Sequence, residues 1–200
     1  KNSVATNNQR GIYLHSNSDN NVVRDNIVDS NTEYGFRVSD SSDNNLILGN
    51  IVSNNTTAGI YIYSADECVI DGNVFSGNGR GLYLRNSANQ NTISNNIIRE
   101  STGVGIDFFD GGSANTVSGN TIINNNNRGI SLEDSSGNTI TGNLLQGNGE
   151  VAGVSSIYIY ATDSNSSNKN VIASNRIAAS VNAPLVEIED GGIQHTGNHL

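Results

Sequence analysis

Two acidic residues, Asp107 and Glu133, have the types and spacing of an acid–base pair. Asp107 is the second residue after Gly105, and Glu133 is the fourth residue after Gly129. If both segments form neighbouring strands, the two side chains lie on a diagonal of about 7–8 Å. This distance overlaps the roughly 6.5–9.5 Å that separates the two carboxyl groups of inverting glycoside hydrolases. The pair therefore predicts a hydrolytic site in which Asp107 is the best-placed acid.

Nearby residue types would also serve a different reaction on an acidic sugar. Arg37 or Arg85 would neutralise a uronate carboxylate, and His15 or Tyr83 would act as the base that removes the C5 proton. Hydrolysis, elimination, epimerisation and binding without catalysis all stay open at this stage.

Aromatic and arginine residues share the positions of the acidic pair. Six of the seven tyrosines occupy the second or fourth place after a glycine or its equivalent, and arginines such as Arg10 and Arg128 directly precede glycines. Rings offer apolar surface to sugars, and arginine holds a carboxylate or sulfate with two hydrogen bonds. We expect a groove for an anionic polysaccharide, with a purely stabilising side-chain ladder as the alternative. The expected binding residues are Tyr13, Tyr34, Arg37, Tyr61, Tyr63, Arg80, Phe109, Tyr158 and Tyr160.

A repeat of 23 or 24 residues, with one interval of 32, positions these side chains. Each repeat holds three short apolar segments and no helix-length stretch, so it buries its apolar side only by stacking on its neighbours. The repeat predicts an all-β, right-handed parallel β-helix of about eight coils with three strands per coil. The repeated asparagines are Asn2, Asn26, Asn50, Asn73, Asn96, Asn120, Asn143, Asn175 and Asn198.

Alternation within each segment predicts which side chains face the core. We expect the repeated asparagines to occupy tight turns in left-handed conformation, with their amides stacked from coil to coil. Core ladders are expected three residues before these asparagines, two residues after them, and directly after the glycines. The ladder two residues after them would be Val4, Val28, Val52, Phe75, Ile98, Ile122, Leu145 and Ile177.

Composition excludes several classes of function. A net charge of −9 disfavours nucleic-acid binding, and no apolar run is long enough to span a membrane. One cysteine, Cys68, and three histidines make a poor set of copper ligands. We expect no cofactor, with calcium left open because several turns carry acids. These turn acids are Asp40, Asp43, Asp66, Asp110, Asp134 and Asp163.

The whole chain, residues 1–200, is expected to be one domain. Its repeats begin and end in mid-phrase, which favours a piece of a longer surface protein with other domains as partners. Extra residues near 149–153 and 162–169 would form a wall at one end of the groove, with a tolerated surface insertion as the alternative.

The phrase Asn-x-Ile-x-Gly-Asn-x-Ile, followed by Gly-Ile-x-Leu, resembles the repeats of pectate lyases, alginate C5-epimerases and NosD-like periplasmic proteins. Tyr34-Gly-Phe36 is similar to the start of the epimerases' Tyr-Gly-Phe-Asp-Pro-His motif but continues as Arg37-Val-Ser39. The resemblance carries over Tyr34 and not the Asp–His pair. It implies an extracellular or cell-surface protein that acts on or binds polysaccharide; a noncatalytic adhesin or structural domain and a NosD-like periplasmic protein are the alternatives.

Overall fold

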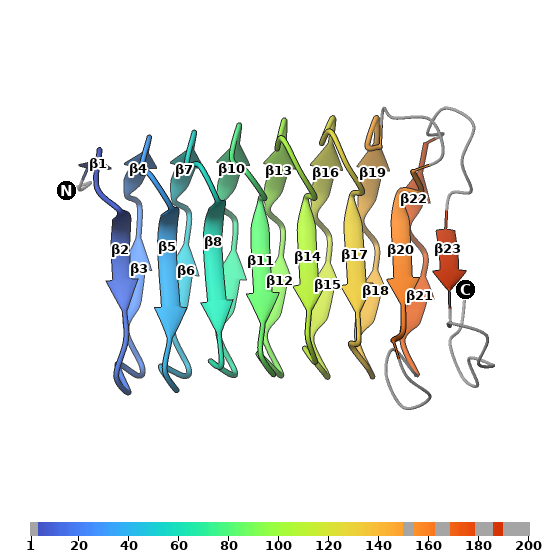
Figure 1. Cartoon of the computed structure of the whole chain (residues 1–200), viewed down its shortest axis with the longest axis horizontal. Helices are drawn as coiled ribbons and strands as arrows, with labels where there is room; N and C mark the ends of the chain where they lie inside the picture. Colours follow the sequence, from blue (N-terminus) through green and yellow to red (C-terminus); the bar gives the residue numbers. More distant parts are fainter. Residues whose placement is uncertain (1–3, 150–153, 163–168, 179–185, 190–200) are drawn as a thin grey trace.

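The computed structural model describes residues 4–149, 154–162, 169–178 and 186–189, and these form a parallel β-solenoid (Figure 1). The described residues contain strands and turns but no helix. Strands that follow one another in the chain lie in different sheets, so each sheet pairs every third strand. The predicted parallel β-helix with three strands per coil is confirmed.

Three long parallel sheets run along the solenoid. Sheet 1 consists of β1 (Val4–Thr6), β4 (Ile27–Asp29), β7 (Ile51–Ser53), β10 (Val74–Ser76), β13 (Ile97–Arg99), β16 (Thr121–Ile123), β19 (Leu144–Gln146) and β22 (Arg176–Ile177). Sheet 2 consists of β2 (Arg10–Leu14), β5 (Tyr34–Ser39), β8 (Ala58–Tyr63), β11 (Leu82–Arg85), β14 (Ile106–Phe109), β17 (Ile130–Glu133), β20 (Ile157–Tyr160) and β23 (Val186–Glu189). Sheet 3 consists of β3 (Val22–Arg24), β6 (Leu46–Leu48), β9 (Val69–Asp71), β12 (Thr92–Ser94), β15 (Thr116–Ser118), β18 (Thr139–Thr141) and β21 (Val171–Ala173).

Aliphatic and phenylalanine ladders fill the interior as the alternation predicts. Ile93, Ile98 and Ile106 represent the three ladders in the middle of the solenoid, and all three are fully buried. The prediction is wrong at Val4, whose side chain is 66% exposed. Val4 pairs with Ile27, so Ala5 takes the inward place beside Val28. Asn2 and Asn198 lie outside the described residues.

The backbone at the tight turns between sheets 3 and 1 corrects the expected conformation of the repeated asparagines. The left-handed residue is the one before each of them, with φ of +57° at Asp25 and +61° at Gly49. Asn26 and Asn50 are not among the residues with positive φ. Glycine or a short polar residue suits the left-handed place, which leaves the following asparagine free to turn its side chain inward.

Stacked amides link the coils at this corner. The Asn73 side chain donates to Asn96 Oδ1 at 3.0 Å, and the Asn96 side chain donates to Asn120 Oδ1 at the same distance. Each Oδ1 also accepts the backbone N–H of the preceding coil's asparagine, as Asn96 Oδ1 does for Asn73 at 2.9 Å. The amides thereby satisfy the backbone N–H groups of these asparagines, while neighbouring groups of the turns bond backbone to backbone between coils.

Two further asparagine ladders, which the sequence analysis did not predict, occupy the other two corners. One precedes sheet 3 and the other follows sheet 1, and both repeat the amide-to-amide pattern. Each ladder is interrupted once, by Cys68 and by Ser101 respectively. The three ladders are Asn26, Asn50, Asn73, Asn96, Asn120, Asn143 and Asn175; Asn21, Asn45, Asn91, Asn115, Asn138 and Asn170; and Asn31, Asn55, Asn78, Asn125 and Asn148.

The glycines that open the strands of sheet 2 are needed because coils approach closely there. A Cβ atom on Gly35 would lie 2.6 Å from the Gly59 carbonyl oxygen and 2.8 Å from the Asn55 amide nitrogen. Glycines in equivalent places, at or directly before the first residues of β2, β5, β8, β11, β14 and β17, meet similar close contacts. Within the described part of the chain, no helix could span a membrane.

Candidate functional site

The outer face of sheet 2 gathers the predicted site residues into one surface. Strand register aligns Tyr83 with Asp107 and Asp107 with Ser131, and it aligns Arg85 with Phe109. Most of the predicted site residues lie on two outward-facing ladders of side chains. Tyr34 and Arg80 lie on a third outward-facing ladder. The central ladder is Tyr13, Arg37, Tyr61, Tyr83, Asp107, Ser131 and Tyr158.

Tyrosine rings on this face pack on one another rather than presenting open faces. The Tyr61 ring stacks on Tyr34 at 4.7 Å and on Tyr83 at 5.2 Å between centroids. Only 7% of Tyr61 is exposed, and burial raises its pKa to about 12. Little of the Tyr61 ring is therefore open to solvent, and its role in sugar binding stays a prediction.

Arginines cover most of the remaining rings. The Arg10 and Arg37 guanidinium carbons lie 4.9 and 5.1 Å from the Tyr13 centroid. Arg80 lies 4.5 Å from the centroid of Tyr83. Two more arginines follow the same pattern: Arg85 over Phe109 at 4.9 Å and Arg128 over Tyr158 at 3.7 Å.

The rings thus act as supports for cations. A guanidinium stacked on a ring gains cation–π energy and keeps its N–H edge for an anion. Fixing a long side chain beforehand also lowers the entropy lost when a ligand binds. Guanidinium groups held in this way are chemically able to contact a carboxylate or a sulfate through two N–H groups.

Asp107 lies in the middle of the face and is paired with Arg80. Its Oδ2 accepts a hydrogen bond from Arg80 Nε at 2.7 Å. Burial raises the pKa of Asp107 above its ordinary value, although the charges of Arg80 and Arg128 act in the opposite direction. An acid with a raised pKa in a cleft is a candidate for proton transfer.

Glu133 is the second predicted acid and is half-buried. Burial is the largest cause of its raised pKa, and the negative charges of Asp134 and Asp107 raise it further. The register places Glu133 diagonally from Asp107, as predicted, because Asp107 aligns with Ser131 on the same strand as Glu133. The two carboxyl groups therefore influence each other electrostatically.

The other predicted catalytic residues are only partly brought to this pair. Tyr83 is the direct neighbour of Asp107, and Arg85 lies over Phe109. His15 follows β2, four strands from β14, which is about 19 Å along the sheet. It is exposed, stacks on Tyr13 at 4.4 Å and hydrogen-bonds Ser16 Oγ, so it cannot act with Asp107 on one sugar.

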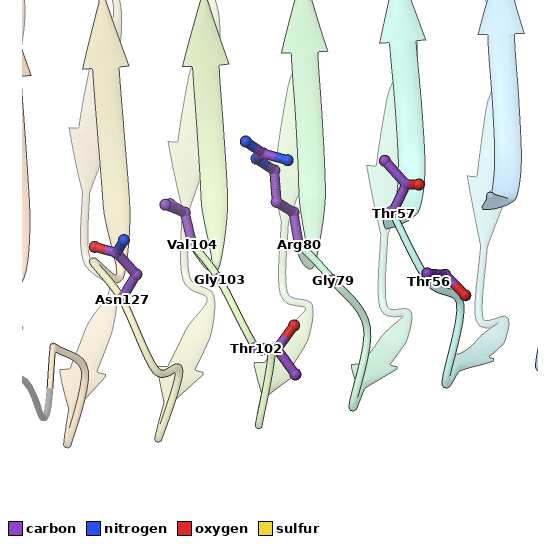
Figure 2. Close-up of a pocket in the computed structure, with 8 residues that line it drawn as sticks. All are labelled: Thr56, Thr57, Gly79, Arg80, Thr102, Gly103, Val104 and Asn127. Atoms are coloured by element: carbon purple, nitrogen blue, oxygen red, sulfur yellow. The ribbon is translucent and has the colours of Figure 1, made fainter. Parts of the chain in front are cut away.

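A hollow of about 350 Å³ lies at the N-terminal ends of the central strands of sheet 2 (Figure 2). Arg80 rises beside it, so the hollow and the Arg80–Asp107 pair are adjacent. The sequence did not lead us to expect this hollow. The small residues that precede the strands of sheet 2 were the signal that could have indicated it. The lining residues are Thr56, Thr57, Gly79, Arg80, Thr102, Gly103, Val104 and Asn127.

Several aspartates in the turns accept hydrogen bonds from backbone N–H groups. Asp43 Oδ1 accepts the backbone N–H of Asp66, and Asp66 Oδ1 accepts that of Asn89. Asp134 accepts the backbone N–H and the hydroxyl of Thr162. Among the described residues, no three His, Cys, Asp or Glu side chains are grouped to hold a metal ion. Asp163 and the inserted segments 150–153 and 163–168 lie outside the described residues.

The chain was compared with protein families, with curated protein sequences and with solved structures. The family model described as "Periplasmic copper-binding protein (NosD)" matches residues 1–87 and 57–187. No curated protein sequence matches the chain.

Several solved structures share the fold. The mannuronan C-5 epimerase AlgE4 A-module of Azotobacter vinelandii has a TM-score of 0.76 at 18% identity, with 98% of this chain and 55% of that chain covered. The periplasmic alginate epimerase AlgG has a TM-score of 0.73 at 22% identity, with 96% and 47% covered. The Dettilon tailspike protein has a TM-score of 0.66 at 18% identity, with 90% and 42% covered. The chain spans about half the length of these proteins, and at such identities the likeness shows the fold alone.

Proposed function

The chain belongs to the NosD family, and from this premise we propose that the outer face of sheet 2 binds an anionic, uronate-containing polysaccharide. The observation that carries the proposal is the group of arginines, each held over an aromatic ring, on one face of a protein with a net charge of −9. Solenoids of this shape include epimerases of alginate and mannuronan, both uronate polymers, which supports the ligand class.

Binding is the activity that the side-chain geometry supports best. The guanidinium groups of Arg37, Arg85 and Arg128 have no carboxylate within ion-pair distance in the described part of the chain. An uncompensated, ring-supported arginine is suited to a carboxylate, which it contacts with two N–H groups. A ligand that runs along the solenoid axis would meet these groups in turn.

Catalysis would centre on Asp107 and Glu133. Their raised pKa values would let one carboxyl group carry a proton that it donates to a glycosidic oxygen, while the other activates water. The hollow is lined by Arg80, the partner of Asp107, and would offer room for part of a sugar. Elimination or epimerisation would need a base near C5, and Tyr83 is the candidate that neighbours Asp107.

Titration of the full chain against oligomannuronate, oligogalacturonate and neutral oligosaccharides tests the proposal. We expect the charged sugars alone to bind, and we expect Arg37→Gln to weaken that binding while Arg99→Gln on sheet 1 does not. Absence of binding to any charged sugar would leave an adhesin or structural role, for which the mutual stacking of Tyr34, Tyr61 and Tyr83 already provides a reason.

Product analysis decides between the chemistries. A new ultraviolet-absorbing unsaturated sugar indicates elimination, new reducing ends without that absorbance indicate hydrolysis, and unchanged polymer indicates binding alone. Loss of either product signal in Asp107→Asn, with binding retained, would assign the reaction to the central acid.

Copper, which the family description names, does not fit the described residues. Cys68 is buried, burial raises its thiol pKa to about 11, and its Sγ faces the Ser42 and Asp66 carbonyl oxygens. His15 is the one histidine in the described part of the chain, and it lies on the outer face of sheet 2. A copper ion prefers several nitrogen or sulfur ligands at one place, which these residues do not supply. The location that the family and the AlgG likeness support is periplasmic or extracellular.

A further inference from the structure

The hollow beside Arg80 lies at a segment of the chain that is one residue shorter than its neighbours. In three successive coils, residues 55–59, 78–81 and 101–105 lead from the corner after sheet 1 to a glycine at the start of a strand of sheet 2, and the middle segment is the short one. The hollow is lined by this segment and by the coils on both sides of it (Figure 2). The short segment thus leaves space that a longer one would fill.

The short segment also leaves two backbone donors of the next coil without a partner. Among the described residues, the N–H groups of Gly103 and Val104 have no acceptor. The equivalent N–H groups of Thr57 and Ala58 both donate to the Glu33 carbonyl oxygen, at 2.7 and 3.2 Å. The short segment lacks the residue that corresponds to Glu33, so the acceptor is missing. Buried backbone N–H groups are nearly always paired, and Val104 is only 8% exposed.

Arg80 lines the same hollow and has donors that its own contacts do not use. Its Nε donates to Asp107 Oδ2 at 2.7 Å, and its guanidinium carbon lies 4.5 Å from the centroid of the Tyr83 ring. These two contacts fix the orientation of the guanidinium group. Arginine carries further N–H groups on its two terminal nitrogen atoms, and those of Arg80 have no acceptor in the part of the chain that the structure describes.

The lining of the hollow suits one negatively charged oxygen group. Arg80 is the one cation among the lining residues, and none of them is acidic. Successive backbone N–H groups form concave anion sites, and guanidinium groups bind carboxylates. Asp107 contacts Nε of Arg80 and is not a lining residue. The volume of about 350 Å³ is at the lower end of the roughly 300–1,000 Å³ of ligand pockets, which favours one sugar over a longer stretch of polymer.

We propose that the hollow is a subsite for the carboxylate of a single uronate sugar, which accepts hydrogen bonds from the terminal N–H groups of Arg80 and the backbone N–H groups of Gly103 and Val104. The sugar is held at the N-terminal ends of the strands, beside the outer face of sheet 2 (Figure 2). It lies next to the Arg80–Asp107 pair, because Arg80 belongs to both. This inference rests on the proposed function and adds the place where one sugar of the ligand is anchored.

Amide spectra of the isotope-labelled full chain test the two backbone donors directly. Titration with a mannuronate hexasaccharide or a galacturonate hexasaccharide should move the Gly103 and Val104 amide protons downfield, because each gains a hydrogen bond to a carboxylate. The amides of sheets 1 and 3 serve as the internal reference. Neutral mannohexaose should leave both signals in place.

A matched pair of variants tests the hollow by affinity. Thr102→Glu puts a carboxylate at the hollow, where it competes for the same donors, and should weaken hexasaccharide binding about tenfold. Thr32→Glu adds the same charge at the equivalent exposed residue of an earlier coil, outside the hollow, and should change the affinity by less than about twofold.

Three results would overturn the inference. Hexasaccharide binding with the Gly103 and Val104 amides unmoved, or with equal affinity in the two glutamate variants, would refute the subsite and leave the proposed function standing. Equal amide shifts with acetate at the same concentration would mean that a bare carboxylate suffices, so the site would not be one for a sugar. Absence of binding by both hexasaccharides would refute the subsite and the proposed function together.

Discussion

The asparagine ladders and the Tyr/Arg face of sheet 2 are both built by stacking side chains at coil spacing, yet they differ in composition. In the buried ladders the same residue recurs, and each amide binds the next, as between Asn96 and Asn120. On sheet 2 the central ladder changes from tyrosine to arginine to aspartate, and three guanidinium groups lack an acid partner in the described residues. The identical asparagines satisfy the hydrogen bonds of the turn backbone. The mixed side chains of sheet 2 instead leave arginine charges that are available to a ligand.

Breaking a buried ladder should have the largest effect on stability. Asn96→Ala removes the acceptor of the Asn73 N–H groups and the donor to the Ile70 carbonyl. At about 1–3 kcal/mol for each buried group left unpaired, we expect the free energy of unfolding to fall by about 3–5 kcal/mol. Urea unfolding measures it, with exposed Asn126→Ala as the control. A loss below about 1 kcal/mol would show that the amide ladder is dispensable.

Substitutions of Tyr61 test a ring that is buried although it belongs to the outer face of sheet 2. Tyr61→Ala removes a ring buried between Tyr34 and Tyr83, so we expect a loss of about 2 kcal/mol in unfolding free energy. Tyr61→Phe keeps the stack and should be close to wild type in thermal melting. If the alanine variant melts normally but loses sugar binding, Tyr61 contacts the ligand directly and its structural assignment fails.

Repairing an interrupted ladder should stabilise the protein. Ser101 stands where the ladder has asparagine in the coils before and after it, and its buried hydroxyl lacks a partner. Ser101→Asn would give Asn78 an acceptor, and we expect a gain of about 1 kcal/mol and a melting temperature higher by about 2–4 °C. Ser101→Ala should be near neutral, since it removes only an unpaired hydroxyl. A destabilised asparagine variant would mean that the ladder is not the favoured arrangement at this coil.

The central acid should give the smallest effect, visible as a dependence on pH. Because the folded-state pKa of Asp107 is raised, its contribution to stability is present below the unfolded pKa and is lost as pH rises through the folded pKa. Asp107→Asn lacks this dependence. We therefore expect the unfolding free energy of the variant, minus that of wild type, to increase between about pH 3 and pH 7. A decrease would mean that the Arg80 pair outweighs burial.

Periodicity predicted the solenoid and the facing of most residues, because a 23-residue repeat with three apolar segments has one way to stack. It failed at Val4, because the segment between β1 and β2 is one residue shorter than the segment between β4 and β5, which shifts the register of β1. It also placed the left-handed conformation on Asn26 instead of Asp25, since both residue types adopt it. Spacing identified the residues of the site but not their contacts, because a long side chain such as Arg80 reaches an acid on the next coil.

The most direct test of the account joins binding and stability in one protein. In the triple variant Arg37→Gln, Arg85→Gln, Arg128→Gln, the mannuronate hexasaccharide should bind at least about 100-fold more weakly than to wild type. The free energy of unfolding, measured on the same samples, should fall by less than about 2 kcal/mol, since only ring-stacked cations are lost. Wild-type affinity in this variant would contradict the claim that the varied face of sheet 2 is the functional surface.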